Sequence, residues 1–209
     1  MTTGVPGRIA LVPLASEIIA RRLVSEVFSL ERSIDGRLRT VAFGPEFPGD
    51  ALMMYERLRA AAGQDGVVDG SYVVVDTATG TAVGQIGTFG PLDGHEVEFG
   101  YGINRSWWGR GTATTAVAQL IAQLEVRSGI GQLVADTSVD NPASGRVLEK
   151  NGFVATSRRA SAEGELIRWV RRPDAGERQA TCSRRTGRPL FRVPTVRVIR
   201  LQRPRVQSA

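Results

Sequence analysis

The sequence predicts an α/β domain of the α+β kind, and three observations carry that prediction. Residues 96–104 alternate apolar and polar side chains, which is typical of a half-buried strand, and after a turn with two glycines the apolar spacing over 113–129 becomes that of a helix. Residues 71–76 and 82–89 predict two strands joined as a hairpin at 77–80. A chain of 209 residues is long enough for one sizeable core.

The strand over 96–104 divides its side chains between two faces. The apolar face holds Val97, Phe99, Tyr101 and Ile103, and the other face holds Glu96, Glu98, Gly100 and Gly102. The following helix carries an apolar stripe made by Ala113, Ala116, Val117, Leu120, Ile121 and Leu124. Between them lies the turn 107–112, and function should be sought there.

The segments before this strand predict one more strand and two helices. A first strand is expected over 8–14, followed by a helix that Ser16 caps and that reaches Val27. A glycine- and proline-containing loop over 36–48 then leads to a second helix. That helix starts near residue 50, and its apolar side is made by Leu52, Met53, Tyr55, Leu58 and Ala61.

The segments after the turn complete the sheet. Residues 132–139 predict a strand, after which Asn141 can cap a helix that begins at Pro142 and ends at Gly152. Residues 153–156 and 166–170 predict the closing strands.

The positive charge of the chain is concentrated at its C-terminal end. Residues 174–209 have a net charge of +7, whereas residues 1–173 have a net charge of −1. We therefore predict a folded domain over 1–173 and an Arg-rich tail over 174–209 that is disordered or laid on a partner. Nucleic acid is expected to bind only through this tail, because the body is nearly neutral.

Metal and membrane functions are not expected. Cys182 is the only cysteine and His95 the only histidine, so neither an internal disulfide nor a structural zinc site is predicted. No apolar stretch approaches the ~20 residues of a membrane span, and the first residues do not resemble a signal peptide. These features predict a cytoplasmic protein.

The turn 107–112 places two glycines at a helix N-terminus, which suits a phosphate or pyrophosphate. A P-loop would need a Gly-Lys-Ser/Thr sequence, and this turn has no lysine. A dinucleotide fingerprint would need a third glycine where Thr114 stands. The pyrophosphate arm of coenzyme A remains.

The stretch from Ser106 to Gly111 resembles motif A of the GCN5-related N-acetyltransferase (GNAT) family. That motif reads Gln/Arg-x-x-Gly-x-Gly/Ala; Gly109 and Gly111 match it, and Ser106 departs from it. A second block, 141–153, resembles the Asn-x-x-Ser … Lys-x-Gly-Phe block of the RimJ/RimL-like ribosomal-protein acetyltransferase branch. Over residues 6–172 the resemblance implies a GNAT fold, a mixed, mostly antiparallel sheet flanked by helices, with two central strands splayed to admit acetyl-CoA.

The resemblance also implies roles for individual side chains. Glu98 lies in a Glu-x-Gly-Tyr strand where the family places its general base, with Glu96 as the alternative. Ser144 corresponds to the family's proton donor for the departing thiolate, and Tyr101 is the second candidate. The residues expected to hold acetyl-CoA are Tyr101, Ile103, Trp108, Gly109, Arg110, Gly111, Thr112, Asn141 and Ser144.

The resulting hypothesis is an acetyl-CoA-dependent N-acetyltransferase. Its acceptor would be a primary amine, on a protein N-terminus or a small molecule, and the chain would act as a monomer or homodimer. The alternative is a non-catalytic acyl-CoA-binding module of the same fold, which the departure at Ser106 favours.

Overall fold

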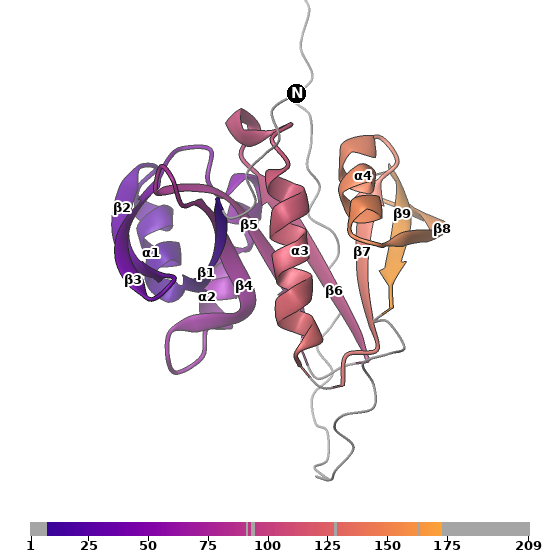
Figure 1. The fold of residues 1–209 in the computed structure, drawn as a ribbon, viewed down its shortest axis with the longest axis horizontal. Coiled ribbons are helices and arrows are strands. Elements are labelled where there is room, and N and C mark those ends of the chain that lie inside the picture. Colours follow the sequence, from indigo (N-terminus) through magenta and orange to yellow (C-terminus); the bar gives the residue numbers. More distant parts are fainter. Residues whose placement is uncertain (1–7, 91, 93–94, 128, 163, 173–209) are drawn as a thin grey trace, which may run out of the picture.

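A nine-stranded sheet runs through the chain in the computed structural model, which describes residues 8–172 without 91, 93–94, 128 and 163 (Figure 1). The strands are β1 (Ile9–Ala15), β2 (Phe28–Ile34), β3 (Arg37–Phe43), β4 (Val67–Asp76), β5 (Thr81–Phe89), β6 (Glu96–Ile103), β7 (Gln132–Ser138), β8 (Val154–Ser161) and β9 (Gly164–Arg171). The helices are α1 (Ser16–Val24), α2 (Tyr55–Ala60), α3 (Thr112–Glu125) and α4 (Pro142–Lys150), with short 3-10 helices η1 (Gly49–Met54) and η2 (Arg105–Trp107).

The strands follow the order β1-β4-β5-β6-β7-β9-β8, and β2 and β3 form a hairpin that joins β5 through β3. Along the main path every neighbouring pair is antiparallel except β6 and β7, which are parallel. This mixed, mostly antiparallel sheet with flanking helices confirms the predicted fold class.

The parallel pair β6–β7 opens along its length. Pairing is limited to Glu96 with Gln132, Val97 with Leu133 and Glu98 with Val134. Beyond Glu98, β6 remains paired to β5 as far as Ile103, while β7 diverges from it (Figure 1). The predicted splay between two central strands is therefore present, and it starts at Glu98.

Two apolar cores lie on opposite faces of the sheet. The first packs α3 and α4 on the sheet and includes Val74, Val97, Phe99, Val117, Leu120, Leu148 and Trp169. The second packs α1 and the β2–β3 hairpin on the other face and includes Leu14, Ile18, Val41, Phe43, Tyr55, Val73 and Val75. Because neighbouring residues of a strand point to opposite faces, β4 contributes to both cores.

The hairpin β2–β3 replaces much of the loop that the sequence analysis predicted over 36–48. Its turn is Asp35-Gly36, and both residues have positive φ angles, 51° and 72°. A two-residue turn of this kind matches the twist of paired strands and favours Asp-Gly. The helix before it ends at Val24, so Val27 lies outside the helix that was expected to include it.

Two further local predictions are corrected. Ser16 is the first residue of α1, and the N-cap position is Ala15, which makes no side-chain capping bond. The second predicted helix is η1 followed by α2, and Met53, placed on its apolar side, is 89% exposed. Tyr55 from the same set is fully buried, and its hydroxyl donates to Gln85 Oε1 at 2.9 Å.

The remaining elements lie where they were predicted, although α3 ends at Glu125 rather than near residue 129 and β8 extends to Ser161. Gly80 N–H donates to the carbonyl oxygen of Asp76 and closes the β4–β5 hairpin. Asn141 caps α4 by accepting from Ser144 N–H at 3.2 Å, and Gly152 after α4 has φ of 78°. The predicted tail, 174–209, lies outside the described residues. No helix among those described has the length and apolar character needed to cross a membrane.

Candidate active site

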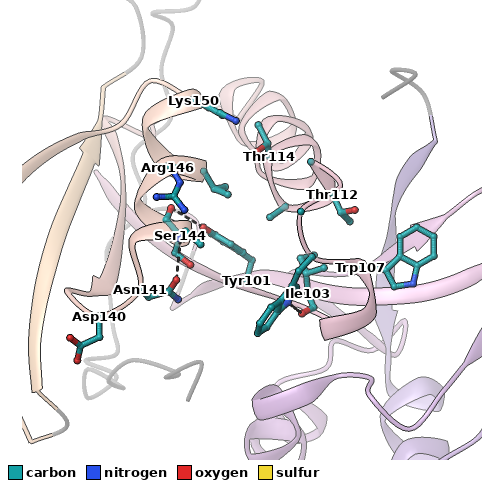
Figure 2. A pocket seen from close by; sticks show the side chains of 16 residues that line it. Tyr101, Ile103, Trp107, Thr112, Thr114, Asp140, Asn141, Ser144, Arg146 and Lys150 are labelled. Carbon is teal, nitrogen blue, oxygen red and sulfur yellow. Dashed lines mark hydrogen bonds between the residues drawn. The ribbon is translucent and has the colours of Figure 1, made fainter. Parts of the chain in front are cut away.

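A cavity of about 350 Å³ lies where β6, the N-terminus of α3 and α4 meet (Figure 2). It is beside the splay, because Tyr101 and Ile103 come from the part of β6 that β7 no longer pairs. Its lining is Tyr101, Ile103, Trp107, Trp108, Gly109, Gly111, Thr112, Ala113, Thr114, Asp140, Asn141, Ala143, Ser144, Arg146, Val147 and Lys150.

The glycine turn forms one wall of this cavity. Gly109 and Gly111 have φ angles of 73° and 77°, which are strained for residues with a Cβ atom. Gly111 is the N-cap of α3, and the first bond of the helix runs from Thr115 N–H to the Gly111 carbonyl oxygen at 3.0 Å. The N–H groups of residues 112–114 therefore have no partner within the helix and can donate to an anion.

The side chains around the turn differ in their contact with the cavity. Trp108 is 52% exposed and lines it, with its indole Nε1 donating to the Ile103 carbonyl oxygen at 2.6 Å. Its backbone N–H already donates to the Arg105 carbonyl oxygen. Arg110, expected to add charge there, instead stacks its guanidinium on the Trp107 ring at 4.9 Å and is outside the lining set.

Ser106 stands at the position that departs from the family motif, and it is also outside the lining. Its N–H and hydroxyl both donate to Glu46 Oε2, at 3.2 and 2.8 Å. The serine therefore links the turn to the segment after β3.

Two basic side chains of the lining come from α4 and were not predicted. Arg146 and Lys150 are one helical turn apart, so both face the cavity from the same side of α4. Their i, i+4 spacing within the predicted helix was the sequence signal that could have identified this pair. They bring positive charge to the wall opposite the glycine turn (Figure 2).

The two proton-donor candidates meet in the cavity. Tyr101 donates its hydroxyl to the backbone carbonyl oxygen of Ser144 at 3.2 Å, and Ser144 also lines the cavity. Burial raises the pKa of Tyr101 to about 12, so the phenol keeps its proton throughout the neutral range. Both hydroxyls can therefore act as donors.

Glu98 lies on the opposite face of β6 and does not line the cavity. Its side chain is 25% exposed, and Oε2 accepts from Arg168 Nη1 at 3.2 Å. Burial raises the pKa of Glu98 above its ordinary value, although Arg168 acts in the opposite direction. Glu96 is more exposed, at 46%, and both its oxygens are held, by Arg168 and by Gln132.

The structure thus brings most predicted residues together across two faces of one strand. The cavity collects Tyr101, Ile103, Trp108, Gly109, Gly111, Thr112, Asn141 and Ser144, while Arg110 lies outside it. Glu98 stands at the last position of β6 that pairs with β7, three residues before Tyr101. The described residues contain no group of three His, Cys, Asp or Glu side chains that could hold a metal ion.

Residues 23–154, more than half of the chain, match the family described as the acetyltransferase (GNAT) domain. The chain belongs to the GNAT family. GNAT proteins use acetyl-CoA, and family membership supports N-acetyl transfer as the class of reaction. The fold resembles solved acetyltransferases, but no curated protein matches the sequence.

Three solved structures illustrate this similarity of fold. A putative GNAT acetyltransferase from Bordetella pertussis is 22% identical, with a TM-score of 0.55, 82% of this chain and 98% of that one being covered. RimL, a ribosomal L7/L12 α-N-protein acetyltransferase in complex with coenzyme A, is 16% identical, with a TM-score of 0.55 and coverage of 81% and 96%. A dodecameric spermidine N-acetyltransferase from Vibrio cholerae is 12% identical, with a TM-score of 0.56 and coverage of 83% and 99%.

Two other matches are shorter. The chain spans 66% of an acetyltransferase (GNAT family) from Bacillus anthracis and 60% of a probable acetyltransferase, each with a TM-score of 0.45.

Proposed function

We propose that this GNAT protein transfers an acetyl group directly from acetyl-CoA to a primary amine, with Glu98 as general base. The observation that carries the proposal is the place where β6 and β7 separate. Their pairing ends at Glu98, and the cavity with Tyr101 and Ser144 begins just beyond. A thioester in this gap would have the carboxylate on one face of the sheet and the hydroxyl donors on the other.

The cavity offers the groups that the anionic end of acetyl-CoA needs. The free N–H groups at the start of α3 suit a pyrophosphate. Arg146 and Lys150 add positive charge from α4. This set, rather than Arg110, is proposed to hold the phosphates.

The residues on the two faces supply the proton transfers. An alkyl amine with a pKa of ~10.4 is mostly protonated at neutral pH and has no free lone pair, so Glu98 takes a proton from the ammonium before the N–C bond forms. Burial makes this carboxylate a better base by raising its pKa. When the C–S bond breaks, Ser144 or Tyr101 gives a proton to the departing thiolate, whose conjugate acid has a pKa of ~8.5.

We propose that the acceptor approaches on the face of Glu98. Gln85 lies directly opposite Gly102, which is on the same face of β6 as Glu98. Because Gln85 accepts a hydrogen bond from the Tyr55 hydroxyl, the start of α2 also lies on that face. The block over 141–153 resembles the RimJ/RimL-like branch, and the similar structures include enzymes named for a protein N-terminus and for spermidine. A protein N-terminal amine or a small amine is therefore the proposed substrate class.

We also propose that residues 1–173 contain the whole acetyl-CoA site and that 174–209 form a separate basic tail. The body carries a net charge of −1 and the tail +7, so any contact with nucleic acid is assigned to the tail.

The test begins with calorimetric titration of the full-length protein with acetyl-CoA, where micromolar binding, about −8 kcal/mol, is expected. Release of CoA is then followed with spermidine and with short peptides that have a free N-terminal amine. Release that depends on Glu98 supports the proposal. Binding without release with either acceptor from pH 6 to 9 would identify a non-catalytic module, and absence of binding would reject both.

A further inference from the structure

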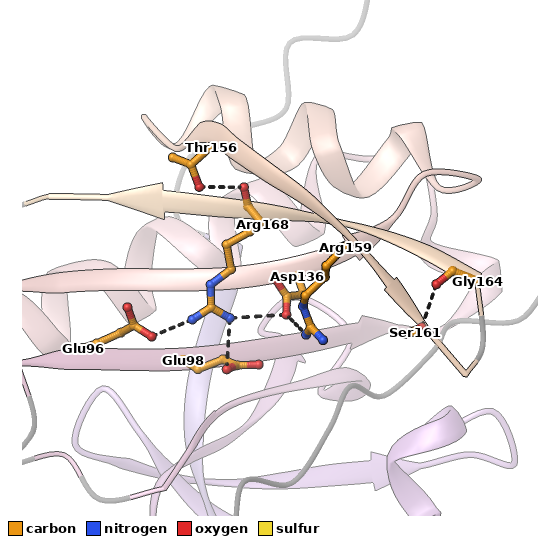
Figure 3. Close-up of polar contacts among 8 residues, drawn as sticks. All are labelled: Glu96, Glu98, Asp136, Thr156, Arg159, Ser161, Gly164 and Arg168. Carbon is orange, nitrogen blue, oxygen red and sulfur yellow. Dashed lines mark hydrogen bonds and ion pairs between the residues drawn. The ribbon is translucent and has the colours of Figure 1, made fainter.

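Arg168 on β9 contacts three carboxylates from two other strands (Figure 3). Its Nη2 lies 2.6 Å from Glu96 Oε1, and its Nη1 lies 3.2 Å from Glu98 Oε2. The same Nη1 lies 3.3 Å from Asp136 Oδ2 on β7. One guanidinium therefore joins both candidate bases of β6 to the neighbouring strand.

Asp136 fixes this guanidinium. Its Cα is directly opposite that of Arg168 in the β7–β9 ladder, and its side chain is only 2% exposed. Oδ2 accepts from Arg168 and from Arg159 of β8, while Oδ1 has no hydrogen-bond partner within the described part of the chain. A buried carboxylate needs compensating charge, so the two arginines are held against it.

The contact matters because it spans the opening of the sheet. β6 and β7 share no backbone pairing beyond Glu98 and Val134. Arg168 reaches from β9 past β7 to the carboxylate at that last paired position. The planar fork of an arginine can hold several carboxylate oxygens at fixed angles, which a single ammonium cannot do.

We propose that Arg168, anchored by Asp136, is a positioning residue that orients the Glu98 carboxylate at the mouth of the splay. The inference rests on the proposed role of Glu98. Arg168 does not contact the cavity that would hold acetyl-CoA, so it acts through Glu98.

The charges that face Glu98 come from four strands. They are Glu96 on β6, Asp136 on β7, Arg159 on β8 and Arg168 on β9, and the β5 residue directly opposite Glu98 is the uncharged Phe89. Burial raises the pKa of Glu98, Asp136 adds to that rise, and both arginines lower it. Removing Arg168 therefore raises the pKa further.

The test is Arg168→Gln, with Arg158→Gln as the matched control. Arg158 lies on β8, is 66% exposed and pairs with Glu165 at 3.5 Å, away from this cluster. The Glu98 carboxyl is titrated by ¹³C NMR in the full-length proteins, its resonance being identified by its absence from Glu98→Gln. We expect its pKa to rise by about one unit in Arg168→Gln and to stay unchanged in the control.

The same proteins are compared by the pH dependence of kcat/KM with spermidine or a peptide amine. We expect the acidic limb of the kcat/KM profile to move to higher pH by the same amount as the Glu98 pKa measured by NMR. The Kd for acetyl-CoA should stay constant. If Arg168→Gln does not fold, Arg168→Lys replaces it. A raised pKa of Glu98 is again expected, because a single ammonium that pairs with buried Asp136 no longer contacts Glu98.

An unchanged Glu98 pKa in the folded Arg168 variant overturns the positioning role, whatever the activity. A shifted pKa with no shift of the kinetic limb also overturns it, because Arg168 would then not influence turnover through Glu98. Failure of the proposed function has a different signature, because Glu98→Gln would then keep full activity. The NMR titration of Glu98 gives its result independently of that activity.

Discussion

The hydroxyl of Tyr101 donates to the backbone carbonyl oxygen of Ser144 at 3.2 Å, and this bond joins β6 to α4 across the cavity. The tyrosine hydroxyl is thus directed to a fixed acceptor, whereas the Ser144 hydroxyl makes no hydrogen bond within the described residues. The serine is therefore the freer donor for a departing thiolate, and the tyrosine holds the helix that presents it.

This difference predicts that Ser144→Ala lowers kcat by about 10²-fold, the typical loss for a general acid, while Tyr101→Phe lowers it by less than about tenfold. Because burial raises the pKa of Tyr101 to about 12, its ionisation gives no alkaline limb in the range used for assays. Steady-state kinetics of both variants decide the assignment. The reverse order of losses would make Tyr101 the donor.

Glu98→Gln is expected to lower kcat by about 10²- to 10³-fold near neutral pH, because an amide cannot accept the proton of the amine. Burial raises the pKa of Glu98, so wild-type activity falls as the pH drops through that raised value, and the variant loses this limb. Glu96→Gln is the matched control and should stay within about threefold of wild type, since its oxygens are engaged by Arg168 and Gln132.

The same pKa sets the expected stability of Glu98→Gln. A carboxyl with a raised folded-state pKa contributes stability below its unfolded pKa, and that contribution is lost as the pH rises through the folded value. At neutral pH the amide is therefore expected to unfold at the same temperature as wild type or higher. A lower melting temperature would show that the Arg168 ion pair outweighs desolvation.

Features predicted correctly from the sequence were local ones. The period-two pattern of β6 and the Asn141 cap of α4 depend on residues close in the chain. The β2–β3 hairpin was also signalled locally, by Asp35-Gly36, but its strands bury alternate residues only weakly, with Leu38 at 68% exposure. A loop was therefore predicted where a hairpin forms.

The missed parts of the site depend on tertiary structure. Arg168 is 70 residues from Glu98 and reaches it only because β9 pairs with β7. Arg110 has the sequence position of a phosphate ligand, yet its guanidinium stacks on the Trp107 ring and does not line the cavity. Neither strand order nor such competition can be determined from spacing along the chain.

The positions of Arg146 and Lys150 in the cavity wall lead to a prediction about the affinity for acetyl-CoA. Arg146→Gln and Lys150→Gln should each raise the Kd for acetyl-CoA about tenfold, equivalent to about 1.4 kcal/mol, because each removes a positive charge from the cavity wall. Arg110→Gln is the control and should change the Kd by less than about threefold. Calorimetry at two salt concentrations checks this, since the losses should shrink at high salt. A larger effect of Arg110 would return that residue to the site.

Gly111 allows the most direct test of the glycine turn. Its φ of 77° costs a residue with a Cβ about 1 kcal/mol, although an added Cβ would meet no atom within 4 Å. Gly111→Ala should therefore lower the melting temperature slightly and weaken acetyl-CoA binding about tenfold as the turn relaxes and the N–H groups of residues 112–114 change direction.

Gly44→Ala is the matched control for this change. Gly44 also has open space around it but no positive φ, and it lies outside the cavity lining. Its substitution should leave both the melting temperature and the Kd unchanged. If Gly111→Ala loses stability yet binds acetyl-CoA as tightly as wild type, the start of α3 does not hold the pyrophosphate, and Arg146 and Lys150 would have to account for cofactor binding.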